Sequence, residues 1–216
     1  MALSSPTLVS YARRWRWDVV LSSENLAPER PAAWAKVVLI QQLLRDFEYV
    51  WWIDADALIV RSDGDVLDET EPDKDIYLVE HPQASPDRSV VPNSGVVLFR
   101  RGEYTVDFLR RLWNKEEYVD HNWWENAALL DLLGHSLEAP WPLTSDTPDR
   151  AHVKFLDVAW NSVPGQCDAP SPFIRHHARA DNRTFETRLA GMSSDLWDSS
   201  LSRTEPTTVG RGIPED

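Results

Sequence analysis

A continuous apolar run, Tyr49-Val50-Trp51-Trp52-Ile53, constrains the fold more than any other feature of this chain. Polar and apolar side chains do not alternate in it, which is the pattern of a strand buried on both faces. A helix is expected just before it, over residues 31–47. Pro31 suits its first turn, because proline lacks an N–H group that would have no helical partner there. A buried strand that follows a helix predicts an α/β fold with a mainly parallel or mixed sheet between helices.

The rest of the chain supplies further elements of such a fold. Helices are predicted over residues 7–17, 103–114 and 123–133, and strands over residues 18–21, 76–80, 95–100, 153–158 and 173–176. The 216 residues are enough for one domain, which we place at residues 1–191. Residues 192–216 are rich in Ser, Thr, Asp and Pro, and we expect them to form a loose tail.

The composition argues against several classes of partner. The chain has 35 acidic and 22 basic residues and a formal net charge of -13, which disfavours nucleic acids and anionic membranes. No apolar run reaches the roughly 18 residues that a membrane span needs. The first residues lack the basic and apolar regions of a signal peptide, and the single Cys167 excludes an internal disulfide. We expect a cytoplasmic protein, or one of a Golgi-type lumen if an N-terminal anchor was removed.

Two aspartates, Asp54 and Asp56, directly follow the predicted buried strand, and residues 57–60 after them are again apolar. Carboxylates between apolar segments are unfavourable unless something compensates their charge. Mg²⁺ or Mn²⁺ does so, and these ions bind carboxylates together with substrate phosphates. The pattern therefore predicts a metal and phosphate site at the C-terminal end of the strand. Two alternatives stay open. The acids could cap a turn, or they could form the Asp-x-Asp of a haloacid-dehalogenase-type phosphatase, although Leu58 is unusual for that family.

The predicted helix 31–47 brings a lysine to the same region. A helix of about 15 residues is roughly 22 Å long, and a strand of about seven residues covers roughly 23 Å. If the strand returns along the helix, the start of the helix and Asp54 share one edge of the sheet. Lys36 would then lie beside the aspartates and pair with them or with a phosphate, unless it is simply a solvated lysine.

Four segments of the chain follow one another in a characteristic order. They are Trp34-Ala35-Lys36-Val37, Trp51-Trp52-Ile53-Asp54-Ala55-Asp56-Ala57-Leu58-Ile59, Asn93-Ser94-Gly95-Val96-Val97-Leu98-Phe99-Arg100 and Trp124-Glu125-Asn126-Ala127-Ala128-Leu129. On these segments the chain from Tyr11 to about Gly191 resembles glycosyltransferase family 34, which contains α-galactosyl-, mannosyl- and xyloglucan xylosyltransferases. The Asp-x-Asp block is the most specific part of the resemblance. The resemblance implies a GT-A fold, a nucleotide-sugar donor, a manganese-like cofactor and transfer with retention of the anomeric configuration.

The resemblance also implies roles for single residues. Phe173-Ile174-Arg175-His176-His177 is similar to a late segment of the family, which places His176 at the metal with Asp54 and Asp56. An exposed histidine pair is the alternative. Glu125 would stabilise the positive charge that develops on the donor sugar, or it is only an acid favoured at a helix start. Asn126 stands where the family has glutamine.

Three more residues complete the predicted site. Asn93 is placed on donor or acceptor hydroxyls, and Gly95 is expected to permit a close backbone approach. Both residue types are also common in a plain turn. Trp124 is a candidate for stacking on a sugar, as are Trp123 and Trp160, although core packing is the more ordinary role of a tryptophan.

Two features depart from the family pattern. Only about ten residues precede the segment that resembles the first helix, so we expect the opening strand of a GT-A domain to be absent or very short. Ala178 stands near the place of a glycine that usually follows the metal histidine. We predict a metal-dependent glycosyltransferase that moves a sugar from a nucleotide-diphosphate donor, UDP-linked rather than GDP-linked, to a carbohydrate or other hydroxyl acceptor. The alternative is a catalytically inactive nucleotide-sugar or glycan-binding protein on the same scaffold.

Overall fold

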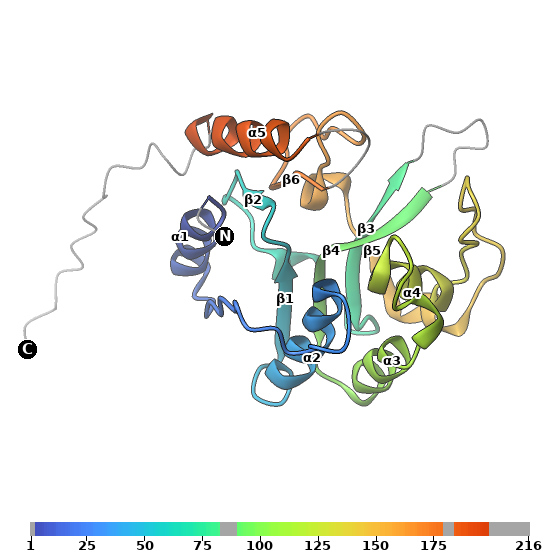
Figure 1. Ribbon diagram of the computed structural model, residues 1–216. Helices are drawn as coiled ribbons and strands as arrows, with labels where there is room; N and C mark the ends of the chain where they lie inside the picture. Colours follow the sequence, from blue (N-terminus) through green and yellow to red (C-terminus); the bar gives the residue numbers. More distant parts are fainter. Residues whose placement is uncertain (1–2, 83–89, 179–183, 199–216) are drawn as a thin grey trace, which may run out of the picture.

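The computed structural model describes residues 3–82, 90–178 and 184–198 and shows an α/β fold (Figure 1). The strands in these ranges are β1 (Tyr49–Ile53), β2 (Ala57–Ile59), β3 (Ile76–Pro82), β4 (Val90–Arg100), β5 (Val153–Phe155) and β6 (Ile174–His176). The α-helices are α1 (Ser5–Trp15), α2 (Ala35–Leu43), α3 (Glu103–Trp113), α4 (Trp124–Leu132) and α5 (Phe185–Asp198). Short 3-10 helices are η1 (Ala32–Trp34), η2 (Val66–Glu69), η3 (Glu116–Tyr118), η4 (Pro148–His152) and η5 (Val158–Asn161).

The central sheet has the strand order β1-β4-β3-β5 and mixed strand directions. β4 is antiparallel to both of its neighbours, with Ile53 of β1 opposite Val96 and His81 of β3 opposite Val91. β5 is parallel to β3. The C-terminal ends of β1 and β3 therefore lie at the same edge of the sheet as the first half of β4. Polar residues that follow β1 and residues early in β4 are brought together there.

One face of the central sheet is covered by α2, α3 and α4. On α3, Phe108, Leu109 and Leu112 recur at helical spacing and face the sheet, as expected for an amphipathic helix. The buried side chains of this layer are Trp34, Val37, Ile40, Leu44, Val50, Ile76, Leu78, Val97, Phe99, Phe108, Leu109, Leu112, Ala128, Leu129, Leu133 and Val153. They form the main core of the protein.

The opposite face is covered by η2, η5 and α1. Tyr77 and Leu98 point to this side, whereas their neighbours Leu78 and Val97 point to the other, so the two central strands are buried on both faces. Trp160 of η5 packs in this second layer and Tyr11 of α1 in a third cluster beside it. Helices on both faces of a mixed sheet confirm the predicted α/β architecture.

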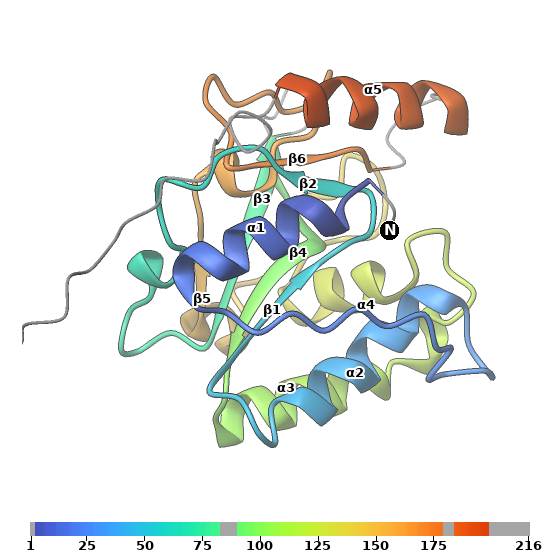
Figure 2. The same cartoon turned by 90° about the vertical axis from the view of Figure 1, so that its left-hand side faces the viewer.

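A small second sheet lies at one end of the molecule. β2 and β6 pair antiparallel, with Ala57 opposite His176. In both Figure 1 and Figure 2 this sheet lies beside α5, at the end opposite α2 and α3. The chain passes from β1 to β2 through residues 54–56, so the Asp-x-Asp motif lies at the junction of the two sheets.

Several predicted elements differ from the observed ones. The helix predicted over residues 31–47 is divided into η1 and α2 and ends at Leu43. Residues 18–21 belong to no strand, because an extended apolar segment becomes a strand only where a neighbour shares its hydrogen bonds, and Val19, Val20 and Leu21 are exposed. In β1 only Val50 is buried. β1 is half-buried rather than fully covered because it is an edge strand beside a cleft.

Both ends of the chain bear on the sequence predictions. Within the described residues, which begin at residue 3, no strand precedes β1. The expected boundary between residues 191 and 192 falls inside α5, whose Met192 is buried. The remainder of the predicted tail, residues 199–216, lies outside the described residues. None of the helices in the described ranges is both long enough and apolar enough to cross a bilayer.

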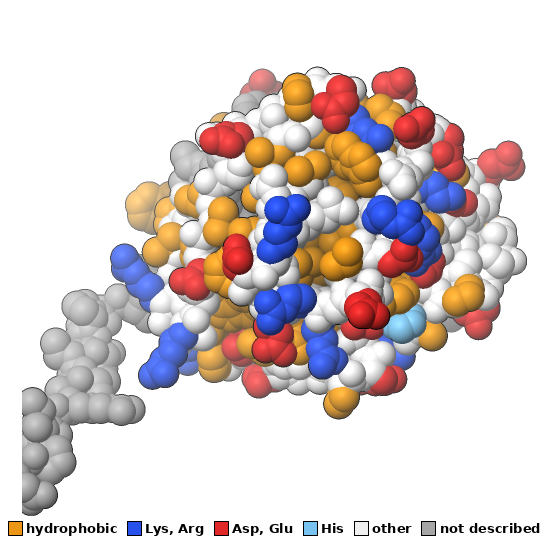
Figure 3. Space-filling model, turned by 90° about the horizontal axis from the view of Figure 1, so that it is seen from below, with side chains coloured by type: hydrophobic (Ala, Val, Ile, Leu, Met, Phe, Trp, Pro, Cys, Tyr) orange, Lys and Arg blue, Asp and Glu red, His pale blue; other side chains and the backbone are white. Residues whose placement is uncertain are grey.

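Side chains of both charges are present on the molecular surface. On the face shown in Figure 3, basic and acidic side chains are interspersed among apolar ones. The described residues on this face form no continuous basic patch of the kind that binds a polyanion.

Candidate functional site

The Asp-x-Asp motif is held in place by the strands on either side of it. The Asp54 N–H donates to the Gly95 carbonyl of β4 over 2.8 Å, and the Asp54 carbonyl accepts from the Ala57 N–H over 3.0 Å. This turn carries Asp56 next to β6, where the His177 N–H donates to the Asp56 carbonyl over 2.8 Å. The main chain, rather than side-chain contacts alone, therefore positions both acids.

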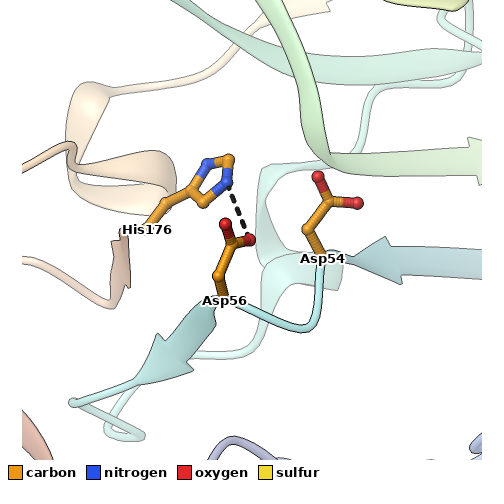
Figure 4. A group of neighbouring side chains, drawn as sticks. All are labelled: Asp54, Asp56 and His176. Carbon is orange, nitrogen blue, oxygen red and sulfur yellow. Dashed lines mark ion pairs between the residues drawn. The ribbon is translucent and has the colours of Figure 1, made fainter. Parts of the chain in front are cut away.

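Asp54, Asp56 and His176 come together at this junction (Figure 4). Each offers one ligand atom, and these atoms all lie within 4.8 Å of one another. The prediction that His176, rather than His177, faces the aspartates agrees with this geometry. The His177 ring instead contacts Asp195 of α5, with 2.7 Å between His177 Nε2 and Asp195 Oδ2.

The His176 ring is oriented by Asn161 of η5. His176 Nδ1 lies 2.9 Å from Asn161 Oδ1, while Asn161 Nδ2 donates to Asn93 Oδ1 over 3.0 Å. Nδ1 therefore donates to Asn161, and Nε2 is the nitrogen that faces Asp56, 3.4 Å from Asp56 Oδ1. His81 contacts the main chain of Asn161, with 2.6 Å between His81 Nε2 and the Asn161 carbonyl oxygen. Burial, helped by the charge of His176, lowers the pKa of His81 to about 4.

Gly95 makes room for this histidine. A Cβ atom at residue 95 would lie 2.2 Å from Cε1 of His176 and 2.9 Å from each ring nitrogen, far inside van der Waals contact. The sequence predicted that Gly95 permits a close approach. In the structure the approaching group is the His176 ring, so any larger residue at this position displaces the ring or β4.

A buried lysine neutralises the acids on the other side of the motif. Lys36 Nζ lies 3.1 Å from Asp54 Oδ1 and 2.8 Å from Glu125 Oε1. Burial alone would lower the pKa of Lys36, but the charges of Asp54 and Glu125 outweigh it and the pKa is raised. The predicted meeting of Lys36 and Asp54 at one edge of the sheet is thus observed, and Glu125 is a second partner.

Glu125 is 4% exposed and has one unpaired oxygen. Its Oε1 accepts from Lys36 and from the Ser94 hydroxyl, the latter over 2.9 Å. Its Oε2 is buried and has no hydrogen-bond partner within the described residues. An unsatisfied buried carboxylate oxygen is unfavourable and is found mostly where a ligand or water completes the site.

Asp56 has a cationic neighbour that the sequence did not indicate. Arg188 of α5 donates from Nη2 to Asp56 Oδ2 and from Nε to the His177 carbonyl, the latter over 2.7 Å. Burial would raise the pKa of Asp56, but the hydrogen bond and charge of His176 and the charge of Arg188 outweigh it, and the pKa is lowered. Arg188 is 132 residues from Asp56 in the chain, so no local motif could have revealed it.

The other predicted residues surround the same space. Asn93 Oδ1 accepts from the Gly95 N–H over 2.9 Å, and Asn126 Oδ1 accepts from the Ser94 N–H over 2.8 Å. Trp124 is 38% exposed and has a φ of 46°, which is strained for a bulky residue. Trp160, by contrast, lies 2% exposed in the core and stacks on Phe173 rather than facing the cleft.

The predicted site residues other than Trp160 line one large cleft of about 1430 Å³. The volume is enough for a ligand of several rings. Its polar wall comprises Lys36, Asp54, Asp56, Asn93, Gly95, Glu125, Asn126, His176 and Arg188. Its aromatic wall includes Trp123, Trp124 and Trp141, and the rings of Trp123 and Trp141 lie 4.8 Å apart. Charged groups and aromatic rings therefore line the same cleft.

The fold is that of GT-A glycosyltransferases. A glycosyltransferase involved in the glycosylation of the major capsid of PBCV-1 superposes with a TM-score of 0.56 at 12% identity, covering 89% of this chain and 91% of its own. The galactosyltransferase LgtC, solved with donor and acceptor sugar analogs, superposes with a TM-score of 0.51 at 13% identity, covering 87% of this chain and 75% of its own. At these identities the likeness establishes the fold alone.

Sequence comparison identifies the family that the chain resembles. Residues 7–81 match the galactosyl transferase GMA12/MNN10 family, which confirms the resemblance to glycosyltransferase family 34. An uncharacterized alpha-1,2-galactosyltransferase of Schizosaccharomyces pombe is 44% identical over 43 residues, 18% of this chain. A probable glycosyltransferase 6 of Oryza sativa is 32% identical over 108 residues, 47% of this chain. The matched segments span 12% and 22% of those two relatives' own lengths.

Proposed function

We propose that this chain is a metal-dependent glycosyltransferase that takes a sugar from a nucleotide-diphosphate donor. The observation that carries the proposal is the convergence of Asp54, Asp56 and His176 on a cleft that Lys36 and Glu125 also line. A GT-A fold and a family match over residues 7–81 support it. Neither of the simpler explanations of the motif, a turn cap or an exposed histidine pair, accounts for the grouping.

The donor set suits a divalent cation such as Mn²⁺ or Mg²⁺. Two carboxylates and one imidazole are ligands that Mn²⁺ accepts, and an incomplete protein shell leaves positions for phosphate oxygens. The room that Gly95 leaves for the His176 ring, and the hydrogen bond from that ring to Asn161, hold one ligand in a fixed orientation. Such a cation would neutralise charge on the leaving diphosphate.

The residues around the cation site have distinct proposed roles. Lys36 holds Asp54 and Glu125 together and adds positive charge beside the diphosphate. Glu125 lines the cleft, and its carboxylate would accept a hydroxyl of the donor sugar or stabilise the positive charge that develops there. Asn93 and Asn126 use their side-chain oxygens to hold β4. Their amide nitrogens can therefore contact hydroxyl groups of the ligands.

The identity of the substrates is proposed from the resemblance and from the aromatic wall. A UDP-linked hexose or pentose, and retention of configuration, follow from the resemblance to glycosyltransferase family 34. Trp123, Trp124 and Trp141 form a surface that suits the faces of sugar rings. We therefore propose a carbohydrate acceptor on that side of the cleft.

The test is a screen of UDP-sugars and GDP-sugars for hydrolysis and transfer, with and without Mn²⁺, in the wild type and in Asp56→Ala. We expect turnover to require the metal and to fall by at least about 100-fold in the variant, the order of effect seen when one group that stabilises transition-state charge is removed. Asp63→Ala is the matched control, because Asp63 is exposed and pairs only with Arg61 among the described residues. Turnover that persists in Asp56→Ala or without metal would refute the proposal. Binding of UDP and Mn²⁺ with no turnover of any donor would favour the inactive binding protein.

A further inference from the structure

Arg188 occupies a position at which a guanidinium and a metal ion need the same carboxylate. It donates to Asp56 Oδ2, while His176 Nε2 lies 3.4 Å from Asp56 Oδ1. Both oxygens of Asp56 thus have a nitrogen neighbour, and the one on Oδ2 is the charged guanidinium. A divalent cation held by Asp54, Asp56 and His176 would lie within a few ångströms of the guanidinium. Like charges at such distances repel strongly in a partly buried site.

The arginine side chain can leave Asp56 without the helix moving. α5 is anchored beyond Arg188 by Asp195, whose carboxylate contacts the His177 ring over 2.7 Å. Gly191 lies against that same ring, where an added Cβ would come within 2.7 Å of its Cε1. Met192 is buried as well. These contacts fix the helix on the small sheet, whereas the Arg188 side chain is 20% exposed and borders the cleft.

A diphosphate offers the guanidinium a better partner than a metal-bound carboxylate. Arginine binds phosphate through two parallel hydrogen bonds, and its planar fork matches the geometry of the phosphate oxygens. In the proposed function the diphosphate binds beside the cation. It is therefore within reach of the long Arg188 side chain, whose guanidinium contacts Asp56 before the ligands bind. The negative diphosphate would then lie between two positive groups, the guanidinium and the cation.

We propose that Arg188 is an exchangeable counter-ion, which competes with a divalent cation for Asp56 and transfers to the diphosphate of the donor when the two bind together. The inference rests on the proposed function, because it takes the metal and the diphosphate as ligands of this cleft. It predicts that the two ligands bind cooperatively. The metal alone must displace Arg188 from its partner, whereas the metal with a diphosphate provides the arginine with a new one. Such coupling is reciprocal by thermodynamic necessity.

The experiment measures binding rather than turnover. Mn²⁺ is titrated into the protein with and without UDP, with free Mn²⁺ followed by electron paramagnetic resonance, and UDP is titrated by calorimetry at saturating Mn²⁺. In the wild type, UDP should tighten Mn²⁺ binding. In Arg188→Gln, Mn²⁺ alone should bind about 10-fold more tightly and UDP about 10-fold more weakly, so the coupling shrinks, within the usual range of such effects. Opposite changes for the two ligands are the signature of exchange.

Two further variants make the result decisive. Arg175→Gln is the matched control, because Arg175 pairs with Asp195 of the same helix and not with Asp56; it should leave both affinities unchanged. Arg188→Lys keeps the charge but cannot form the paired hydrogen bonds, so it should shift both affinities a few-fold in the directions of Arg188→Gln. Arg188→Lys also tests the exchange if Arg188→Gln does not fold.

Four outcomes would overturn the inference. Unchanged affinities in both Arg188 variants mean that the arginine competes with nothing. Weaker binding of both Mn²⁺ and UDP, together with a lower melting temperature, means that Arg188 only fastens α5. A wild type that binds neither ligand refutes the proposed function as well. A wild type that binds both without cooperativity refutes the exchange alone.

Discussion

Replacing Gly95 by alanine tests the geometry on which the candidate metal site depends. The new methyl group would lie 2.2 Å from Cε1 of the His176 ring, whereas carbon atoms in contact are about 3.5–4.0 Å apart. The overlap exceeds an ångström, and the ring is held in place by the hydrogen bond from its Nδ1 to Asn161. Forcing an extra methyl group into a packed interior typically costs about 1–3 kcal/mol, and we expect a loss of that size in the free energy of unfolding.

The same change should weaken the binding of Mn²⁺. If the ring moves away to relieve the overlap, Nε2 no longer faces Asp56. Loss of orienting support for a metal ligand typically lowers affinity about 10–100-fold. Urea unfolding gives the stability, and titration with Mn²⁺ gives the affinity. Gly102→Ala is the matched control, because a Cβ there meets its nearest neighbour, Asp75 Oδ1, at an ordinary 3.6 Å.

A double-mutant cycle separates the steric clash from other effects of the substitution. In a His176→Ala background the ring is gone, so the methyl group at residue 95 has space and Gly95→Ala should cost little. The coupling should therefore be close to the full penalty of the single substitution. An equal cost in both backgrounds would show that the His176 ring does not lie against Gly95, and the site geometry would have to be abandoned.

Two further predictions concern buried charge. Lys36→Met leaves Asp54 and Glu125 without their cation and should destabilise the fold by about 3–5 kcal/mol. Lys36→Met with Glu125→Gln should recover much of this in urea unfolding; no recovery would argue against a buried ion pair. The pKa of His81 is about 4 when folded and ordinarily about 6.5. The unfolded chain therefore binds an extra proton as the pH falls between these values, and stability declines. Compared with His81→Gln, the wild type should lose about 3 kcal/mol more between pH 7 and pH 4. Parallel stability curves would contradict this.

The local elements and the central motif could be predicted from the sequence. α3 was expected over residues 103–114 and spans Glu103–Trp113, because its apolar residues recur at helical spacing. The proximity of Lys36 to Asp54 was also predictable. Both residues belong to one helix–strand unit, in which the lengths of the two elements determine which ends meet. For residues of one such unit, the lengths of the helix and the strand were sufficient to predict the contact.

Predictions failed where an element depends on its neighbours. Residues 18–21 have a strand-like composition but belong to no strand, since the sequence cannot show whether a partner edge is at hand. The sequence predicts that β1 is buried on both faces. The strand lies at the edge of the sheet, and most of its residues are half-buried. Residues 192–198 read as part of a polar tail. They are helical, with Met192 buried and Asp195 paired with His177.

The sequence by itself determined that two acids follow a strand of an α/β sheet and that a lysine lies beside them, because these relations are set by short-range periodicity and element length. Only the tertiary structure decided which distant groups complete the site. Asn161 orients His176, Gly95 leaves room for its ring, and Arg188 reaches Asp56 across 132 residues of chain. Contacts of this kind depend on how separately formed layers pack together, and no spacing along the chain encodes them.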